Sequence, residues 1–204
     1  MTYNSNAIEW STLSENETAK ILFQNKVLSN KSLVEQLEAK NHQAAFWYMF
    51  KYLWSNANII NEEYIFTIHS KLLNWIQDDA WYYRNHWVRI LGSNIPTANY
   101  LSISALMKKL IGHINAKESD IIRHASVIHS DFEKIHPFSD WNWRAWRLLL
   151  NTMLIKAKFP PAIISNDNKA KYYACLNKSQ STWDYSLLED FICDSIIESL
   201  KVFE

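Results

Sequence analysis

The chain is short of glycine. It holds 2 glycines in 204 residues, where ordinary usage of about 7% would place about 14. A fold of this size needs residues with positive φ at its turns and at close backbone approaches, and glycine normally supplies them. Another residue type must therefore occupy such positions, and one type is in excess: the chain holds 10 tryptophans.

Other absences narrow the function. Basic and acidic residues balance at 21 each, so net charge gives no argument for nucleic acid or an anionic membrane as a partner. No apolar run approaches the roughly 18 residues of a membrane span, and the N-terminus lacks the apolar stretch of a signal peptide. The 2 cysteines make no disulfide framework. We expect no nucleic-acid or membrane binding, and a cytoplasmic protein or one delivered from the cytoplasm without a cleavable signal.

The patterns that are present predict a mainly α fold. Apolar residues make up 48% of the chain, and helical spacing and stop signals predict helices over residues 4–9, 41–55, 62–76, 100–114, 119–135, 140–157, 168–178 and 186–202. Between residues 82 and 100 the pattern changes to one typical of a small hairpin and a loop. We expect one domain over residues 1–204, a helical bundle with a small β-hairpin flap at about residues 83–96.

Polar residues gather between two of these helices. Residues 136–147 read His-Pro-Phe-Ser-Asp-Trp-Asn-Trp-Arg-Ala-Trp-Arg. Arg144 and Arg147 are three apart and can point along one side of the new helix. A helix N-terminus with two guanidinium groups and the carboxylate of Asp140 is suited to phosphate and Mg²⁺. The imidazole of His136 can act as a general base beside it.

The order of these residues resembles the signature of the Fic family, H-P-F-x-D/E-G-N-G-R-x-x-R. Seven non-glycine positions match: His136, Pro137, Phe138, Asp140, Asn142, Arg144 and Arg147. Residues 80–93 resemble the flap region of the family, and the similarity extends over about residues 5–195. The resemblance implies a Fic-type helical bundle.

The resemblance also implies an activity. Most Fic proteins transfer AMP from ATP to a Ser, Thr or Tyr hydroxyl of a target protein. His136 would take the proton of that hydroxyl, Asp140 would hold Mg²⁺, and Phe138 would be a buried anchor for the loop. The sequence names neither the target nor an oligomeric state.

The remaining signature positions would bind the nucleotide. By the resemblance, Asn142 and the backbone N–H groups of Trp141 and Trp143 would hold phosphate oxygens. Arg144 and Arg147 would neutralise the polyphosphate, with Arg147 directed at the γ-phosphate.

The flap would dock an extended segment of the target through main-chain hydrogen bonds. Its expected docking residues are Val88, Arg89, Ile90 and Leu91. Arg84, earlier in the flap, is compatible with a target contact and equally with a role in solubility, as is Arg89.

The first residues resemble a second family motif. Ser5-Asn6-Ala7-Ile8-Glu9-Trp10 matches the inhibitory motif S/T-x-x-x-E-G/N except at its last position. In family members with this motif the Glu reaches the second signature Arg, which here pairs Glu9 with Arg147 and makes about residues 1–15 an inhibitory segment. The alternative is that Glu9 only caps a surface helix.

Tryptophan stands where the family carries glycine. These positions are Trp10, Trp81, Trp141, Trp143 and Trp146, with Trp75 and Trp183 at further positions where glycine is common. UGA encodes Trp in some reassigned genetic codes and Gly in another, so we hypothesise that most of these tryptophans are glycines in the natural protein. If they are true tryptophans, the indoles at 141 and 143 crowd the phosphates and the protein is a catalytically dead interaction module. A further alternative is that the same site removes AMP from modified proteins.

Overall fold

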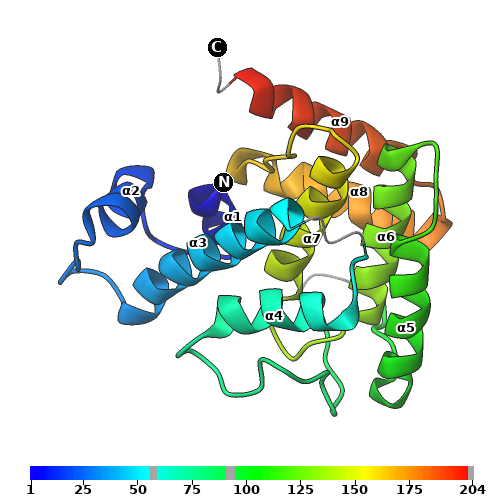
Figure 1. Ribbon diagram of the computed structural model, residues 1–204, viewed down its shortest axis with the longest axis horizontal. Helices are drawn as coiled ribbons and strands as arrows, with labels where there is room; N and C mark the ends of the chain where they lie inside the picture. Colours follow the sequence, from blue (N-terminus) through cyan, green and yellow to red (C-terminus); the bar gives the residue numbers. More distant parts are fainter. Residues whose placement is uncertain (56–58, 91–94, 202–204) are drawn as a thin grey trace.

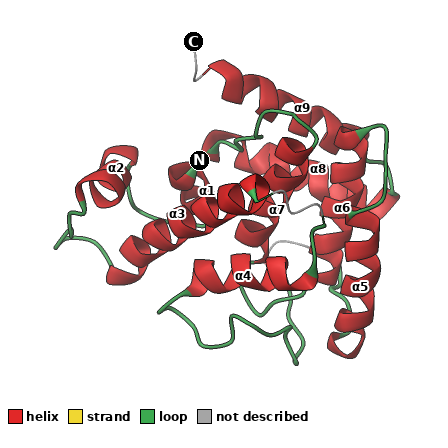
Figure 2. Ribbon diagram, in the orientation of Figure 1, coloured by secondary structure: helices red, strands yellow, loops and turns green. Residues whose placement is uncertain are grey.

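The computed structural model describes residues 1–55, 59–90 and 95–201. Within them the chain forms helices and loops and no strand (Figure 2). The elements are α1 (Thr2–Ile8), α2 (Glu15–Gln24), α3 (Leu33–Trp54), α4 (Glu62–Leu73), η1 (Tyr100–Ser102), α5 (Ile103–Ile114), α6 (Ile121–Ile135), α7 (Asn142–Lys156), η2 (Asn166–Asn168), α8 (Lys169–Thr182) and α9 (Ser186–Leu200). In this part of the chain no helix has the length and apolarity needed to cross a membrane.

The mainly α prediction is confirmed, and the two largest differences lie in α2 and α3. α2 was not predicted, and α3 begins eight residues before the helix predicted there. α2 is largely polar and buries only Thr18 and Ile21, so it offers little apolar periodicity. Its start is nevertheless encoded locally, because Ser14 and Glu17 form a reciprocal capping box.

The predicted hairpin flap is not seen in the described residues of the 83–96 segment. Residues 83–90 and 95–96 follow an irregular path, and Leu91 lies outside the described residues. The turn signal at Pro96 therefore stands in a loop, and the apolar stretch up to Ile90 forms no ladder in the described residues.

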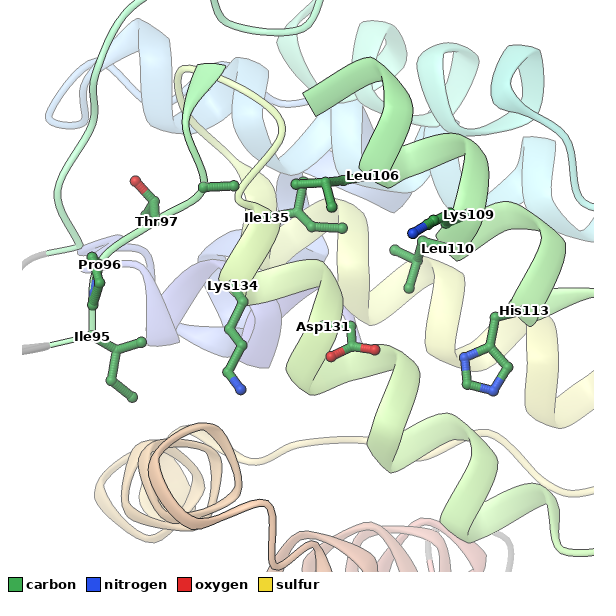
Figure 3. A pocket seen from close by; sticks show the side chains of 11 residues that line it. Ile95, Pro96, Thr97, Leu106, Lys109, Leu110, His113, Asp131, Lys134 and Ile135 are labelled. Atoms are coloured by element: carbon green, nitrogen blue, oxygen red, sulfur yellow. The ribbon is translucent and has the colours of Figure 1, made fainter. Parts of the chain in front are cut away.

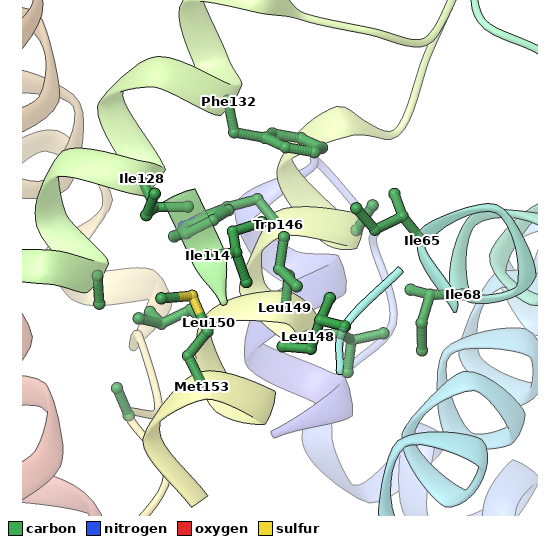
Figure 4. Close-up of a cluster of buried hydrophobic side chains, with 14 of the residues drawn as sticks. Ile65, Ile68, Ile114, Ile128, Phe132, Trp146, Leu148, Leu149, Leu150 and Met153 are labelled. Carbon is green, nitrogen blue, oxygen red and sulfur yellow. The ribbon is translucent and has the colours of Figure 1, made fainter. Parts of the chain in front are cut away.

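α7 lies at the centre of the bundle and contacts α1, α3, α4 and α6 (Figure 1). Twelve of its 15 residues are buried, as expected for a helix enclosed on all sides. On one side Leu148 lies toward Ile68 of α4, and on another Trp146 packs against Phe132 of α6 with ring centroids 5.7 Å apart (Figure 4). α7 is thereby packed against four neighbouring helices.

Three helices end on a tryptophan whose backbone is left-handed. Trp10 follows α1 with φ of 68°, Trp75 follows α4 with φ of 62°, and Trp183 caps α8 with φ of 61°. Helices often end this way, and glycine is the usual residue there because a Cβ costs roughly 1–2 kcal/mol in this conformation. The three side chains are 83%, 87% and 66% exposed, so burial of the indoles offsets little of this unfavourable free energy. If codons for glycine were translated as tryptophan, exposed tryptophans with left-handed backbone would stand at such positions.

We predict that Trp75→Gly raises the free energy of unfolding by about 1 kcal/mol, because it relieves the left-handed strain and removes little buried surface. Trp47→Gly is the matched control, since Trp47 is also exposed but lies inside α3. There glycine should lower stability by about 1 kcal/mol. Denaturant unfolding of both variants is the measurement, and equal destabilisation by both would contradict the interpretation of Trp75.

Candidate active site

The turn from α6 into α7 carries the signature residues. His136 caps α6 with φ of 48°, and Trp141 precedes α7 with φ of 61°. Between them the loop is closed by Asn142, whose Nδ2 donates to the Phe138 carbonyl and whose Oδ1 accepts from the Phe138 N–H, both at 2.9 Å. The amide of Asn142 is thus engaged in holding the loop, and this position is left with its backbone N–H for a ligand.

Phe138 ties the middle of the turn to the core. Its side chain is fully buried and stacks on the ring of His69 in α4, with centroids 3.7 Å apart and planes 9° from parallel. The rings of Phe66 and Tyr83 also pack against the Phe138 ring. These contacts place Phe138 where an anchor for the loop would be.

Arg84 holds the other side of the turn. Its guanidinium is buried and donates to four carbonyl oxygens: His136 at 2.7 Å, Ile135 at 3.2 Å, His86 at 2.7 Å and Ala98 at 2.6 Å. Neither role considered from the sequence, target contact or solubility, fits a buried side chain. Arg84 instead ties the end of α6 to the flap loop, and only the tertiary structure brings these carbonyls to it.

A cleft of about 730 Å³ opens at the start of α7. It brings together most of the predicted site residues from three parts of the chain. These are Glu9, Val88, Arg89, Ile90, His136, Asp140, Trp141, Asn142, Trp143 and Arg144. The first backbone N–H groups of α7 have no intrahelical acceptor, so the cleft has the electrostatic character of an anion site.

Arg147 lies beside this cleft and is fully engaged with the N-terminal segment. Its Nε donates to Ser5 Oγ at 3.0 Å and its Nη2 to the Ser5 carbonyl at 2.9 Å. Both Nη atoms lie 3.1 Å from Glu9 Oε1. α1 is therefore clamped onto the second signature arginine. Glu9 is also the C-cap of α1, where its backbone N–H donates to the Asn6 carbonyl at 2.9 Å, but its side chain pairs with Arg147.

Arg144 has a carboxylate partner that the sequence analysis missed. Its Nη1 lies 3.2 Å from Glu38 Oε2 on α3, and its guanidinium lies over the Trp141 indole at 3.8 Å. Burial raises the pKa of Glu38, and the charge of Arg144 opposes that rise. Glu38 stands in the part of α3 that the periodicity did not reveal, so no sequence signal connected it with the site.

The signature tryptophans take up space at the cleft. Trp141 is nearly buried under Arg144, and Trp143 packs edge-on against Tyr172 and Tyr173. Trp146 lies fully in the core, where its indole Nε1 has no hydrogen-bond partner in the described structure. Glycine at the first two positions would widen the cleft next to the α7 N-terminus.

A second cavity of about 530 Å³ lies between α5, α6 and residues 95–98 (Figure 3). Its lining is mainly apolar, with Lys109, His113, Asp131 and Lys134 among the polar side chains. None of residues 136–147 lines it, so the signature chemistry belongs to the first cleft.

Comparison with known proteins identifies the family. A model of the Fic/DOC family matches residues 59–154. Curated proteins named "Protein adenylyltransferase Fic" are 32% identical in Culex quinquefasciatus and 31% identical in Aedes aegypti, each covering 98% of this chain and 40% of the relative. The chain is therefore a Fic family protein, and the predicted family is confirmed.

Solved structures show the same fold. Fic-1 from C. elegans superposes with a TM-score of 0.87 at 26% identity, covering 100% of this chain and 63% of that one. A Fic domain containing signaling protein from Bacteroides thetaiotaomicron gives a TM-score of 0.83 at 22% identity, covering 96% and 83%. The chain spans about 40% of the length of the curated relatives it matches.

We predict that Arg84→Lys lowers the free energy of unfolding by about 2–4 kcal/mol, because an ammonium cannot reach four separate carbonyls and leaves several buried and unpaired. Arg89→Lys is the control, since Arg89 is an exposed residue of the same loop and should change stability by less than about 0.5 kcal/mol. Thermal unfolding compares them. An unchanged free energy of unfolding in Arg84→Lys would show that the hydrogen bonds of the Arg84 guanidinium do not hold the turn.

Proposed function

We propose that this protein transfers AMP from ATP to a hydroxyl side chain of a target protein and that its N-terminal segment inhibits the transfer. The observation that carries the proposal is the cleft itself. There His136, Asp140 and Arg144 meet the free N–H groups at the start of α7. The name of the curated relatives, protein adenylyltransferase, points to the same reaction.

Phosphate binding would come from backbone and charge together. The N–H groups at 142–144 and the positive end of the α7 dipole favour anionic oxygens. The Trp141 N–H would join them once it releases Asp140 Oδ1. Arg144 and Arg147 would neutralise the polyphosphate, once each guanidinium exchanges its present carboxylate for phosphate. Phosphoryl-group transfer depends mostly on such positioning and charge stabilisation.

His136 would supply the base. Its imidazole would take the proton of the target hydroxyl as that oxygen attacks the α-phosphorus of ATP. The bond from the α-phosphorus to the bridging oxygen breaks, and pyrophosphate leaves. One proton and one AMP unit are thereby transferred, and the protein forms no covalent intermediate.

Asp140 fits the metal role that the family implies. The described residues hold no cluster of three or more metal-ligating side chains. Mg²⁺ nevertheless needs only one or two carboxylates when substrate phosphates and water complete its shell. Asp140 is exposed at the cleft and uses Oδ1 to accept the Trp141 N–H at 2.7 Å. It would hold a Mg²⁺ ion that neutralises phosphate charge.

Target docking would use the loop along the cleft. Val88, Arg89 and Ile90 line the cleft in an irregular segment. Their backbone groups would pair with an extended stretch of a target protein that carries its hydroxyl toward His136. The Val88 carbonyl also accepts a hydrogen bond from Thr97 Oγ1 at 2.8 Å, which holds this loop in place.

Inhibition would come from the clamp on Arg147. Four hydrogen bonds to Ser5 and Glu9 occupy the guanidinium that the γ-phosphate needs. Productive ATP binding therefore requires α1 to release Arg147. Because the same Glu9 could orient water, removal of AMP by this site is the alternative direction of the chemistry.

One observation favours a different function for a chain whose signature tryptophans are real. The Trp141 indole lies against Arg144 and both Trp141 and Trp143 line the cleft. Such a chain would keep the fold and lose phosphate binding, which describes a catalytically dead interaction module.

We predict that Glu9→Gly, in the protein with glycine at positions 141, 143 and 146, raises AMP incorporation at least tenfold, because it frees Arg147, and that adding His136→Ala abolishes the gain. Incorporation of labelled AMP from ATP into the protein itself and into added proteins is the measurement. Glu15→Gly is the control, since Glu15 is an acidic residue of the neighbouring α2 without a contact to Arg147. Loss of AMP removal in Glu9→Gly would favour the reverse reaction. If neither substitution changes AMP transfer or AMP removal, both proposed reactions are contradicted.

We also predict that the double substitution Trp141→Gly with Trp143→Gly tightens ATP binding at least tenfold, because it opens the space beside the α7 N-terminus. Titration calorimetry with ATP in the Glu9→Gly background measures this. Trp54→Gly, at the exposed end of α3, controls for loss of an indole elsewhere. Equal affinities with and without the two indoles would show that the tryptophans fit the site.

A further inference from the structure

A buried carboxylate stands behind the proposed base. Glu133 lies on α6, three residues before His136, and is fully inaccessible to solvent. Neither of its carboxylate oxygens makes a hydrogen bond within the described structure, and neither does His136 Nδ1. Oε2 lies 3.3 Å from that Nδ1. Buried polar atoms without partners are rare and costly, so this pair calls for a functional explanation.

The surroundings leave the imidazole as the natural partner of Glu133. Burial raises the pKa of Glu133, the nearby Glu9 adds to the rise, and His136 and Arg147 oppose it. The Arg147 guanidinium is engaged with Ser5 and Glu9. A positive charge on His136 is therefore the change that most directly compensates the carboxylate.

We propose that Glu133 is a positioning residue for His136: its carboxylate accepts the Nδ1–H and leaves the Nε2 lone pair facing the cleft. The proposal deepens the proposed function, since it assigns a residue that acts through the base. Glu133 itself does not line the cleft, so it would act only through His136.

The proton balance supports this role. Before the reaction the pair holds one proton on Nδ1 and a negative charge on Glu133. When Nε2 takes the proton of the hydroxyl, His136 becomes an imidazolium and the pair becomes neutral overall. A carboxylate fixed at Nδ1 stabilises that imidazolium and selects the tautomer whose other nitrogen can accept a proton. A separation of 3.3 Å without substrate is compatible with a contact that tightens in the reactive complex.

The first test reads the ring directly and needs no turnover. Nitrogen-15 NMR of the full-length chain, with the His136 signals assigned by their loss in His136→Gln, should show a proton on Nδ1. Glu133→Leu, which removes the acceptor, should shift that proton to Nε2. An unchanged ring in Glu133→Leu would overturn the proposal.

The second test uses turnover in the Glu9→Gly background. Glu133→Gln keeps the shape and removes the charge, so we expect kcat to fall about 100-fold with the KM for ATP unchanged and with the thermal midpoint retained. Asp131→Asn is the matched control, because it removes a carboxylate from the same helix on the side of the other cavity, and it should leave kcat within about twofold.

The two tests separate the failure of this inference from the failure of the proposed function. If the Glu9→Gly chain transfers no AMP, the proposed function fails while the NMR result still decides the role of Glu133. If AMP transfer occurs and Glu133→Gln changes only stability or KM, Glu133 is structural and the inference is wrong. Partial recovery of kcat by Glu133→Asp would support the need for the charge.

Discussion

The site depends on one backbone constraint: α6 turns into α7 through two left-handed residues, His136 and Trp141. This turn brings the imidazole beside the first N–H groups of α7, where an anion binds best. The loop between them keeps its shape because Asn142 closes it around Phe138 and Arg84 holds its α6 end. Fold and chemistry therefore share one short segment.

Two arginines in the buried helix α7 each need a partner of opposite charge. Arg144 and Arg147 are almost inaccessible to solvent. Each has a carboxylate partner from another segment, Glu38 in α3 and Glu9 at the C-terminal cap of α1. A buried charge without a partner is strongly unfavourable, so these pairs help the helices pack. Phosphates would have to replace the same carboxylates, which makes folding stability and inhibition two consequences of the same contacts.

The sequence predicted what is encoded locally. Helices with clear stops, such as the one ended before Pro137, and the signature segment were found at nearly their true positions. α2 was missed although its capping box was readable at Ser14 and Glu17. Arg84, Glu38 and Glu133 could not be assigned from the sequence, because their partners come from distant segments or depend on burial. The shortage of glycine did indicate an anomaly, and four tryptophans prove to have left-handed backbone.

The most direct test of this account is the mass of the peptide covering residues 137–147 in the protein from its natural source. The turn works as a phosphate site when its backbone can approach the ligand closely, which glycine allows and tryptophan does not. We predict masses with Gly at positions 141, 143 and 146, giving an intact Fic signature. Masses with Trp at these positions would contradict the account and make the chain a non-catalytic member of the family.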